Sequence, residues 1–384
     1  MRFAPLSSSP RTAPVLLRRP SATRPLLAPG VLLFSLLLLM SPTLVEAQQG
    51  QVEMDPDRAR LLYVSNDPAD HSIGRDFERD IAQKAVTDSI FEAVSKGVLA
   101  YRKIEYRSSV GDLDIPAYLY EPLEPRGEHG HPALIWVHGG VHGNWTPNYW
   151  PFIEEAVERG YVVIAPEYRG STGYGQEFHD AIDYGGYEVD DAASAYDWMV
   201  ENLPHVDPER VAIMGWSHGG YISLLAVSRG EHPFQAAVGI VPVSNLIFRL
   251  SYKGPRYQHF FATQERIRGL PFEAREIYVE RSPVYQVDHI DVPVLVHLAD
   301  NDNDVDFVEA EMLVHALQVK KPELAETKIY HDPPGGHSFS RQVEMSTLTR
   351  NDTPAQRDSW NRVWTFLEWN LRPYEDGEGV VVDN

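Results

Sequence analysis

The sequence contains no cysteine among its 384 residues. Without cysteine the chain cannot form a disulfide, use a thiol as a nucleophile or carry a lipid-modified cysteine as a membrane anchor. Basic residues are also scarce, because 34 Lys and Arg stand against 55 Asp and Glu and give a formal net charge of -21. An acidic surface of this kind disfavours nucleic acids and anionic membranes as partners.

Long apolar runs and internal repeats are missing as well. The longest apolar run, residues 31–40, has about ten residues, whereas a membrane-spanning helix needs about twenty. It follows five arginines and precedes a possible cleavage site at Val45-Glu46-Ala47, so we expect residues 1–47 to be a signal peptide. Cleavage near Ala47 would give an exported protein, periplasmic or secreted, with no stable membrane anchor; an uncleaved anchor is the alternative. The absence of repeats with a period of about 20–50 residues argues against a β-propeller.

The sequence does contain a regular alternation of strand patterns and helix patterns. Strands are predicted at residues 114–120 (an edge strand), 133–137, 161–165, 210–214, 236–241, 292–298 and 327–330. Helices are predicted at residues 76–96, 150–159, 187–202, from about 220, 307–320 and 356–370. This alternation predicts an α/β fold with a mostly parallel central sheet and helices on both faces.

The same patterns divide the chain into segments. Residues 48–97 form an N-terminal extension with a helix, residues 98–373 form the α/β domain, and residues 374–384 form an acidic C-terminal tail. Within the α/β domain the alternation stops at about 244–290, where aromatic and basic residues predict a small helical cap insertion.

The pentapeptide Gly215-Trp216-Ser217-His218-Gly219 lies between a predicted strand and a predicted helix. In that setting a G-x-S-x-G sequence holds its serine on a strained turn, and the helix N-terminus offers free N–H groups to a developing oxyanion. The pentapeptide also occurs by chance, so the strand–turn–helix context carries the interpretation. Ser217 is therefore the predicted nucleophile.

Two further polar loops follow predicted strands, on the side of the sheet where function gathers in such folds. Asp302 is favoured as the acid over Asp300, because Asp300 directly follows the strand whereas Asp302 can reach back from the loop. His337 is favoured as the base over His331, because two glycines let its loop fold over Ser217. The order Ser217, Asp302, His337 is that of an α/β-hydrolase triad.

Two metal sites were weighed against this interpretation and are disfavoured. The D-x-D-x-D pattern with Glu311 at its twelfth position resembles a calcium loop, but Val305 stands where such a loop needs glycine, and a strand precedes it. His138 and His142 could bind a metal, but no third ligand is evident. The sequence therefore predicts no metal and no cofactor.

A second source of oxyanion donors is expected in His138-Gly139-Gly140, which directly follows the strand predicted at 133–137. This is the position of the H-G-G motif in hydrolases. The backbone N–H groups of Gly139 and His218 would converge on the oxyanion. The alternative is that these glycines only form a turn.

Three motifs together resemble the prolyl oligopeptidase family of serine peptidases, which includes dipeptidyl and acylaminoacyl peptidases. They are residues 215–221 (GWSHGGY), 167–175 (EYRGSTGYG) and 138–140 (HGG), and the second is much more specific than G-x-S-x-G. The resemblance covers roughly residues 98–370. It implies an α/β-hydrolase fold and peptidase activity, and the family's D-x-x-V pattern and loop histidine fall on Asp302 and His337.

Two departures from the family bear on the substrate. The family's peptidases usually carry a β-propeller before the hydrolase domain, whereas only about 50 residues separate Ala47 from that domain here, so we expect the propeller to be lacking. Relatives often place Asn or Arg two positions after the catalytic acid to hold a substrate carbonyl. This sequence has Asp304 there, which is expected to repel acidic substrates.

A serine peptidase that cleaves small peptides or aminoacyl bonds is the favoured function. A carboxylesterase acting on small or polymer-linked acyl esters is the alternative, since both enzymes use an acyl-enzyme and a fold does not decide the substrate. An inactive binding protein is disfavoured, because the triad and the oxyanion glycines are all present. The cap is expected to line the substrate pocket, although core packing is an equally open role for its aromatic residues. The expected lining residues are Tyr252, Tyr257, Phe260 and Phe261.

Overall fold

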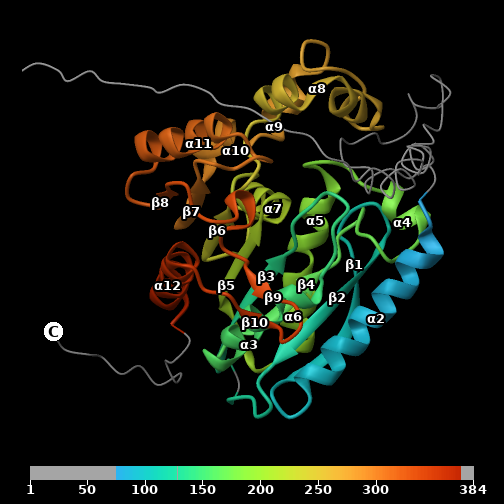
Figure 1. The fold of residues 1–384 in the computed structure, drawn as a ribbon, viewed down its shortest axis with the longest axis vertical. Coiled ribbons are helices and arrows are strands. Elements are labelled where there is room, and N and C mark those ends of the chain that lie inside the picture. The colour runs from blue at the N-terminus through green and yellow to red at the C-terminus, as the bar shows by residue number, and fades with distance from the viewer. Residues whose placement is uncertain (1–74, 128, 373–384) are drawn as a thin grey trace, which may run out of the picture. The chain divides into compact units, whose positions relative to one another are not determined.

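The computed structural model describes residues 75–127 and 129–372. The predicted signal peptide (residues 1–47), much of the predicted N-terminal extension and the acidic tail (residues 374–384) lie outside the described residues. In the described part of the chain, strands and helices alternate and build a central sheet covered by helices (Figure 1). None of the helices described there is both long and apolar enough to cross a membrane.

The central sheet has eight strands in the order β1-β2-β4-β3-β5-β6-β7-β8. The strands are β1 (Ala100–Arg107), β2 (Asp114–Glu121), β3 (His131–Val137), β4 (Val162–Pro166), β5 (Val206–Trp216), β6 (Ala236–Ile240), β7 (Val294–Ala299) and β8 (Ala325–Tyr330). Strand β2 pairs antiparallel with β1 and β4, and the remaining neighbours pair parallel. The carboxyl ends of the parallel strands therefore share one side of the sheet, where ligands bind in open α/β folds.

The helices are α2 (Phe77–Ser95), α3 (Trp150–Glu158), α4 (Gln176–Asp180), α5 (Tyr187–Ala193), α6 (Ala195–Asn202), α7 (His218–Ala226), α8 (Leu246–Thr263), α9 (Arg275–Glu280), α10 (Pro283–Gln286), α11 (Phe307–Lys320) and α12 (Pro354–Leu371). They cover both faces of the sheet, because successive side chains of a strand point to opposite sides. In β3, Ala133, Ile135 and Val137 join a core that includes α5, α6, α7, α8 and α11. Leu134 and Trp136 join the other core, with α2, α3 and α12.

Tryptophan side chains fill the core on the side of α3 and α12. Trp136 of β3, Trp216 of β5 and Trp360 of α12 are buried, and their ring centroids lie 5.5 or 5.6 Å apart in each pair. Aromatic pairs at this spacing contribute about 0.5–1.5 kcal/mol each beyond the burial of their area. Because Trp216 directly precedes Ser217, this packing fixes the end of β5 on which the serine turn is built.

Most of the predicted elements are confirmed, but strand β1 was not predicted, and three details of the prediction are wrong. Strand β2 is not an edge strand, because β1 pairs along its outer side. The helix predicted at 187–202 is two helices, since the Ser194 hydroxyl at the junction donates to the Asp190 carbonyl at 2.7 Å and accepts the N–H of Ser109 at 2.9 Å. Helix α7 begins at His218 rather than near Gly220.

The segment between β6 and β7, where the cap is predicted, is helical and holds α8, α9 and α10. Helix α8 is kinked at Gly254, whose φ of 80° and ψ of -178° are not helical, and Pro255 follows. A proline inside a helix lacks the N–H that would bond to the preceding turn, which accounts for the kink. The first half of α8, before the kink, carries the side chains that reach the loop after β7, as described below.

Candidate active site

Ser217 lies on the tight turn that joins β5 to α7. Its backbone has φ 52° and ψ -116°, a conformation that residues with a side chain rarely adopt. The Ser217 N–H donates to the Ile240 carbonyl, and the Tyr221 N–H donates to the Ser217 carbonyl, both at 2.9 Å. A Cβ at Gly219 would overlap the carbonyl oxygen of Val137, so the glycine lets α7 begin against the end of β3. Together these contacts fix Ser217 on the carboxyl side of the sheet.

Asp302 and His337, on the loops that follow β7 and β8, form a hydrogen-bonded pair. Nδ1 of His337 lies 2.7 Å from Oδ2 of Asp302. Oδ1 of Asp302 accepts the backbone N–H groups of Asp304 and Val305 at 2.8 and 2.9 Å. The carboxylate is therefore held from both sides, and it orients the imidazole so that Nε2 is the nitrogen left for proton exchange.

The loops of Ser217 and His337 follow parallel strands and so lie on the same side of the sheet. Nε2 of His337 lies 3.6 Å from Oδ2 of Asp304, and the hydrogen bonds between described residues include none from the Ser217 hydroxyl to His337. Hydrogen bonds of a catalytic site are often completed only when substrate is bound. The part of the triad geometry that is formed here is thus the His337–Asp302 pair.

The alternative acid and base form a separate pair at the surface. Nδ1 of His331 lies 2.9 Å from Oδ2 of Asp300, and the His331 side chain is 80% exposed. The N–H of Asp332 and the His331 ring hold the pKa of the Asp300 carboxyl below its ordinary value. Both oxygens of Asp302, in contrast, accept or share hydrogen bonds with other protein groups. Within residues 75–127 and 129–372, no group of three or more His, Asp or Glu is placed to hold a metal ion.

The oxyanion loop, residues 138–145 after β3, lies against Ser217, since a Cβ built on Gly139 would stand 3.5 Å from the Ser217 Cβ. The Gly139 N–H was expected to face the oxyanion, but it donates to the hydroxyl of Tyr149 at 3.1 Å. His218 is the first residue of α7, where a backbone N–H has no acceptor within its own helix. Of the two predicted donors, the backbone N–H of His218 lies at a helix start, as expected, whereas the N–H of Gly139 is bonded to the Tyr149 hydroxyl.

Tyr149 and Arg341 are site residues that the sequence analysis missed. Burial raises the pKa of the Tyr149 hydroxyl, while the positive charge of the Arg341 guanidinium and the Gly139 N–H, which bonds to its oxygen, oppose that rise. Because that oxygen accepts the Gly139 N–H, its own hydrogen remains to be donated. Nη1 of Arg341 also lies 3.7 Å from the position that a Cβ would take on Gly139. Neither residue belongs to a motif, and their only sequence signal is that each lies within about a dozen residues of a predicted site residue.

The two histidines of the oxyanion loop contact the loop that follows β4. Nε2 of His138 lies 2.8 Å from Oγ of Ser171, and Nδ1 of His142 lies 2.7 Å from the carbonyl oxygen of Gly170. Burial holds the pKa of His142 well below its ordinary value, so its ring is neutral at physiological pH. Both rings thus tie the oxyanion loop to residues 167–175, the segment that contains the Tyr-Arg-Gly motif.

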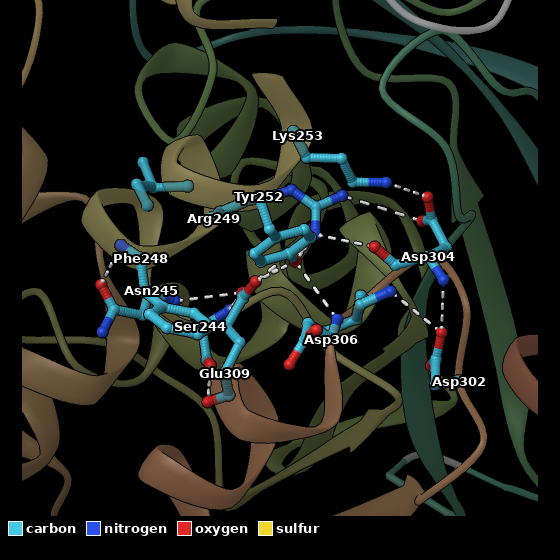
Figure 2. A network of polar contacts seen from close by, with 12 residues as sticks. Ser244, Asn245, Phe248, Arg249, Tyr252, Lys253, Asp302, Asp304, Asp306 and Glu309 are labelled. Atoms are coloured by element: carbon cyan, nitrogen blue, oxygen red, sulfur yellow. Dashed lines mark hydrogen bonds and ion pairs between the residues drawn. The ribbon is translucent and has the colours of Figure 1, made fainter.

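Asp304 lies beside His337 but is not an isolated negative charge. Its carboxylate forms an ion pair with Lys253 and lies 3.7 Å from Nη2 of Arg249, and both cations come from α8 (Figure 2). Burial alone would raise the pKa of Asp304, but Arg249, His337 and Lys253 hold it below its ordinary value. Two cations thus offset the charge of Asp304, and the expected repulsion of acidic substrates stays a prediction.

The network in Figure 2 connects the cap to the loop of the catalytic acid. Arg249 donates to the hydroxyl of Tyr252 at 2.9 Å, and Tyr252 donates to Glu309 of α11. The Tyr252 hydroxyl also accepts the N–H of Asp306 at 3.2 Å. Tyr252, predicted as a lining residue of the pocket, thus has a structural task of its own beside the Asp302 loop.

The other predicted lining residues pack into the protein core. Tyr257, Phe260 and Phe261 are 5%, 2% and 0% exposed. Their rings surround Tyr184, with centroids 6.5, 6.1 and 4.5 Å from the Tyr184 ring. The Tyr257 hydroxyl accepts a hydrogen bond from Arg249 at 3.2 Å. Of the two roles that the sequence left open, core packing is the one that these contacts support.

Comparison with known proteins agrees with this geometry. Residues 149–352, more than half of the chain, match the prolyl oligopeptidase family. An uncharacterized peptidase of Bacillus subtilis, YuxL, is 32% identical over 241 residues, which cover 62% of this chain and 36% of that protein. Dipeptidyl aminopeptidase BIII of Pseudoxanthomonas mexicana is 32% identical over 214 residues, which cover 55% of this chain and 30% of that protein. The chain thus spans about a third of the length of these curated relatives.

Solved structures share the fold. The acylaminoacyl peptidase of Pyrococcus horikoshii superposes with a TM-score of 0.58 at 21% identity, over 75% of this chain and 45% of that one. A puromycin-hydrolyzing peptidase of Mycobacterium tuberculosis gives a TM-score of 0.57 at 26% identity, over 73% of this chain and 40% of that one. The fold is that of the α/β-hydrolase peptidases, and the match over residues 149–352 shows that the chain belongs to the prolyl oligopeptidase family.

Proposed function

We propose that this protein is a serine peptidase of the prolyl oligopeptidase type that cleaves small peptides or aminoacyl bonds. The observation that carries the proposal is the His337–Asp302 pair, at 2.7 Å, on the same side of a parallel sheet as the strained Ser217 turn. A buried carboxylate that orients an imidazole near a serine at a helix start is the arrangement that acyl transfer requires. Membership of a family of peptidases supports the same assignment.

In the proposed mechanism the hydroxyl oxygen of Ser217 attacks the substrate carbonyl carbon while Nε2 of His337 takes the hydroxyl proton. Asp302 stabilises the imidazolium that forms. The negative charge on the carbonyl oxygen would be met by the N–H of His218, the hydroxyl of Tyr149 and the nearby guanidinium of Arg341. Collapse of this intermediate breaks the C–N bond, and the amine leaves with the proton from His337. Water then attacks the acyl carbon while His337 takes one of its protons, and the ester bond to Ser217 breaks as His337 returns that proton to the serine oxygen.

The substrate class is inferred from the relatives. Two of them are named a dipeptidyl aminopeptidase and, in Mus musculus, an acylamino-acid-releasing enzyme, and both names describe action on amino-acid bonds rather than on simple esters. The deciding experiment compares kcat/KM for aminoacyl-p-nitroanilides and for p-nitrophenyl acyl esters, with Ser217→Ala as the control for background hydrolysis. Turnover of the anilides supports the peptidase. Turnover of esters alone would replace it with a carboxylesterase.

We also propose that the protein is exported, either to the periplasm or out of the cell, after cleavage near Ala47. The support is the arginine-rich start, the short apolar run at residues 31–40 and the small residue that closes Val45-Glu46-Ala47. These residues lie outside the described part of the chain.

A further inference from the structure

Lys84 is a buried lysine of α2, the helix that packs along the outer strands β1 and β2 (Figure 1). The buried residues of α2 are Lys84, Thr87, Phe91 and Ser95. The Lys84 side chain is 4% exposed and passes Gly173, where a Cβ would stand only 2.7 Å from the Cβ of Lys84. Glycine at position 173 therefore leaves the room through which the lysine reaches the interior.

The ammonium group of Lys84 binds two loops at once. It forms an ion pair with Glu167, whose side chain is fully buried, and it donates to the carbonyl of Trp145 at 2.9 Å. It also lies 3.5 Å from Oδ1 of Asn144. Glu167 in turn accepts the N–H of Trp145 at 3.1 Å. One cation thus connects α2, the oxyanion loop and the loop that begins after β4.

These contacts continue to the residues on both sides of Gly139. The second carboxylate oxygen of Glu167 has no hydrogen-bond partner among the described residues and lies 3.4 Å from Nε2 of His138. On the other side, the hydroxyl of Tyr168 donates to the carbonyl of Gly140. Glu167, which bonds to Trp145, and its chain neighbour Tyr168, which bonds to Gly140, therefore hold the oxyanion loop where it passes Ser217.

We propose that Lys84 is a positioning residue, which fixes the oxyanion loop beside Ser217 through its ion pair with Glu167. The inference rests on the proposed function, because it assigns a task within the same site. A buried carboxylate that loses its cation takes up a proton or draws in water, and its hydrogen-bond geometry changes. A misplacement of about 1 Å in groups that position a reaction can lower the rate by about 100-fold.

Other contacts hold α2 in place without Lys84. Phe91 packs against the tyrosine rings of β1 and β2, and Asp88 pairs with Lys103 of β1 at 2.8 Å. These groups contact the outer strands, whereas the Lys84 ammonium, which lies 4.8 Å from the centroid of the Tyr118 ring of β2, also bonds to the oxyanion loop. Loss of the Lys84 charge should therefore leave the helix docked and change the loop.

The test compares Lys84→Met with Lys103→Met. Methionine keeps much of the apolar length of lysine and removes its charge. Lys103 is the matched control, because it also forms an ion pair with α2, but its side chain is 41% exposed and it contacts Asp88 rather than the loop. The measurement is the rate constant for labelling of Ser217 by a fluorophosphonate, which tests the oxyanion groups whether the natural substrate is a peptide or an ester. Values of kcat and KM follow on a substrate that the wild type turns over.

We expect Lys84→Met to be labelled at least ~10-fold more slowly than the wild type, with kcat lowered in parallel and KM within ~2-fold, since the loop acts on the transition state. Lys103→Met should be labelled at the wild-type rate. A folded Lys84→Met protein that is labelled as fast as the wild type overturns the proposal. If the wild type itself is not labelled at Ser217, the proposed function fails instead.

A charge-neutral variant decides the question if Lys84→Met does not fold. Lys84→Met combined with Glu167→Gln removes both buried charges, so no carboxylate is left without its cation. It should still be labelled slowly, because the donor to the Trp145 carbonyl is gone. Since the chain has no cysteine, Lys84→Cys can also be alkylated with 2-bromoethylamine to restore an ammonium group at that position alone. The alkylated protein should regain labelling, and recovery of stability without recovery of labelling would also overturn the proposal.

Discussion

At the scale of single residues, the first prediction concerns Ser217, the serine of the β5–α7 turn. Ser217→Ala should lower kcat by on the order of 10³ or more, because removal of a triad nucleophile leaves only binding and oxyanion stabilisation. The fold should persist, since both backbone bonds of residue 217 are made by main-chain atoms. Hydrolysis and fluorophosphonate labelling measure the effect. A variant that keeps more than about a tenth of the activity would place the nucleophile elsewhere.

The two acids of the loop after β7 make the second prediction. Asp302→Asn should reduce activity far more than Asp300→Asn, because Asp302 holds Nδ1 of His337 at 2.7 Å and Asp300 holds the exposed His331. An amide in place of the carboxylate misorients the imidazole and no longer stabilises its cation; in a comparable triad this lowers kcat by about 10⁴-fold. Steady-state kinetics of the two variants, which are isosteric controls for each other, check it. Equal losses would show that the loop acts as a whole.

Asp304 and its cations make a third prediction. Lys253→Met should make the enzyme discriminate against acidic substrates several-fold more than the wild type, because one of the two cations that offset Asp304 is removed. The effect should shrink as ionic strength rises, since salt screens charges that are partly exposed. A panel of neutral and acidic substrates at two salt concentrations measures it. Lys320→Met, which loses a surface ion pair with Asp288, is the control.

Site residues on loops that directly follow a strand could be predicted from the sequence. Site residues whose side chains reach the site from other helices or turns could not. Ser217, Asp302 and His337 each follow a predicted strand, so the sequence alone brings their loops to one side of the sheet. Tyr149 and Lys84 reach the oxyanion loop through packing of a short helical turn and of α2. The sequence signal for the burial of Lys84 is its helical spacing from Phe91, which places both side chains on one face of α2.

At the scale of secondary-structure elements, the buried parallel strands were the easiest to predict. Strands such as β3, which are covered on both faces, are continuous apolar runs, and this signal needs no knowledge of the neighbouring strand. Strand β1 was not predicted, because half of its residues are exposed and its sequence has four charged residues among eight and no continuous apolar run. The division between α5 and α6 at Ser194 has no signal in the sequence, and one of the bonds made there comes from Ser109, far away in the chain.

Glu188, in the first turn of α5, should make the stability of the fold depend on pH. Glu188 is fully buried and accepts the N–H of Gly186 at 3.2 Å, and burial, with Asp183 nearby, raises its pKa from the ordinary 4.5 to about 7. A carboxyl whose pKa is higher in the folded than in the unfolded protein binds its proton more tightly in the folded state. Its contribution to the free energy of unfolding is complete at pH values below the unfolded pKa. That contribution is lost as the pH rises from about 4.5 through about 7.

Glu188→Gln should therefore gain stability relative to the wild type between pH 4.5 and 7, with no further gain above about pH 8. Urea denaturation of both proteins across this range measures the difference. His142, whose pKa is lowered by burial, is common to the two proteins, whereas Nε2 of His218 lies 3.5 Å from Oε1 of Glu188, so the difference reports the Glu188 carboxyl together with this neighbouring ring. Stability curves that run parallel over the whole range would show that Glu188 is ionised throughout.

At the scale of the whole molecule, α2 shows that the helix predicted in the N-terminal extension packs as part of the α/β domain. Phe91 joins the core on the α3 and α12 side, and Lys84 reaches the oxyanion loop. The described chain from residue 75 is thus connected to the site through α2 as well as through the sheet. The expected role of the residues before 75 rests on their amino-acid composition alone.

The last prediction concerns those residues. The first 47 contain five arginines, a single acid and the apolar run 31–40, whereas the chain as a whole has a formal charge of -21. A basic start followed by a short apolar segment is the pattern that export machinery recognises, and an apolar run of about ten residues is too short to remain as a membrane span. We therefore expect protein recovered from the periplasm or medium to begin at or near Gln48. N-terminal sequencing decides this, and an intact Met1 on membrane-bound material would instead indicate an uncleaved anchor.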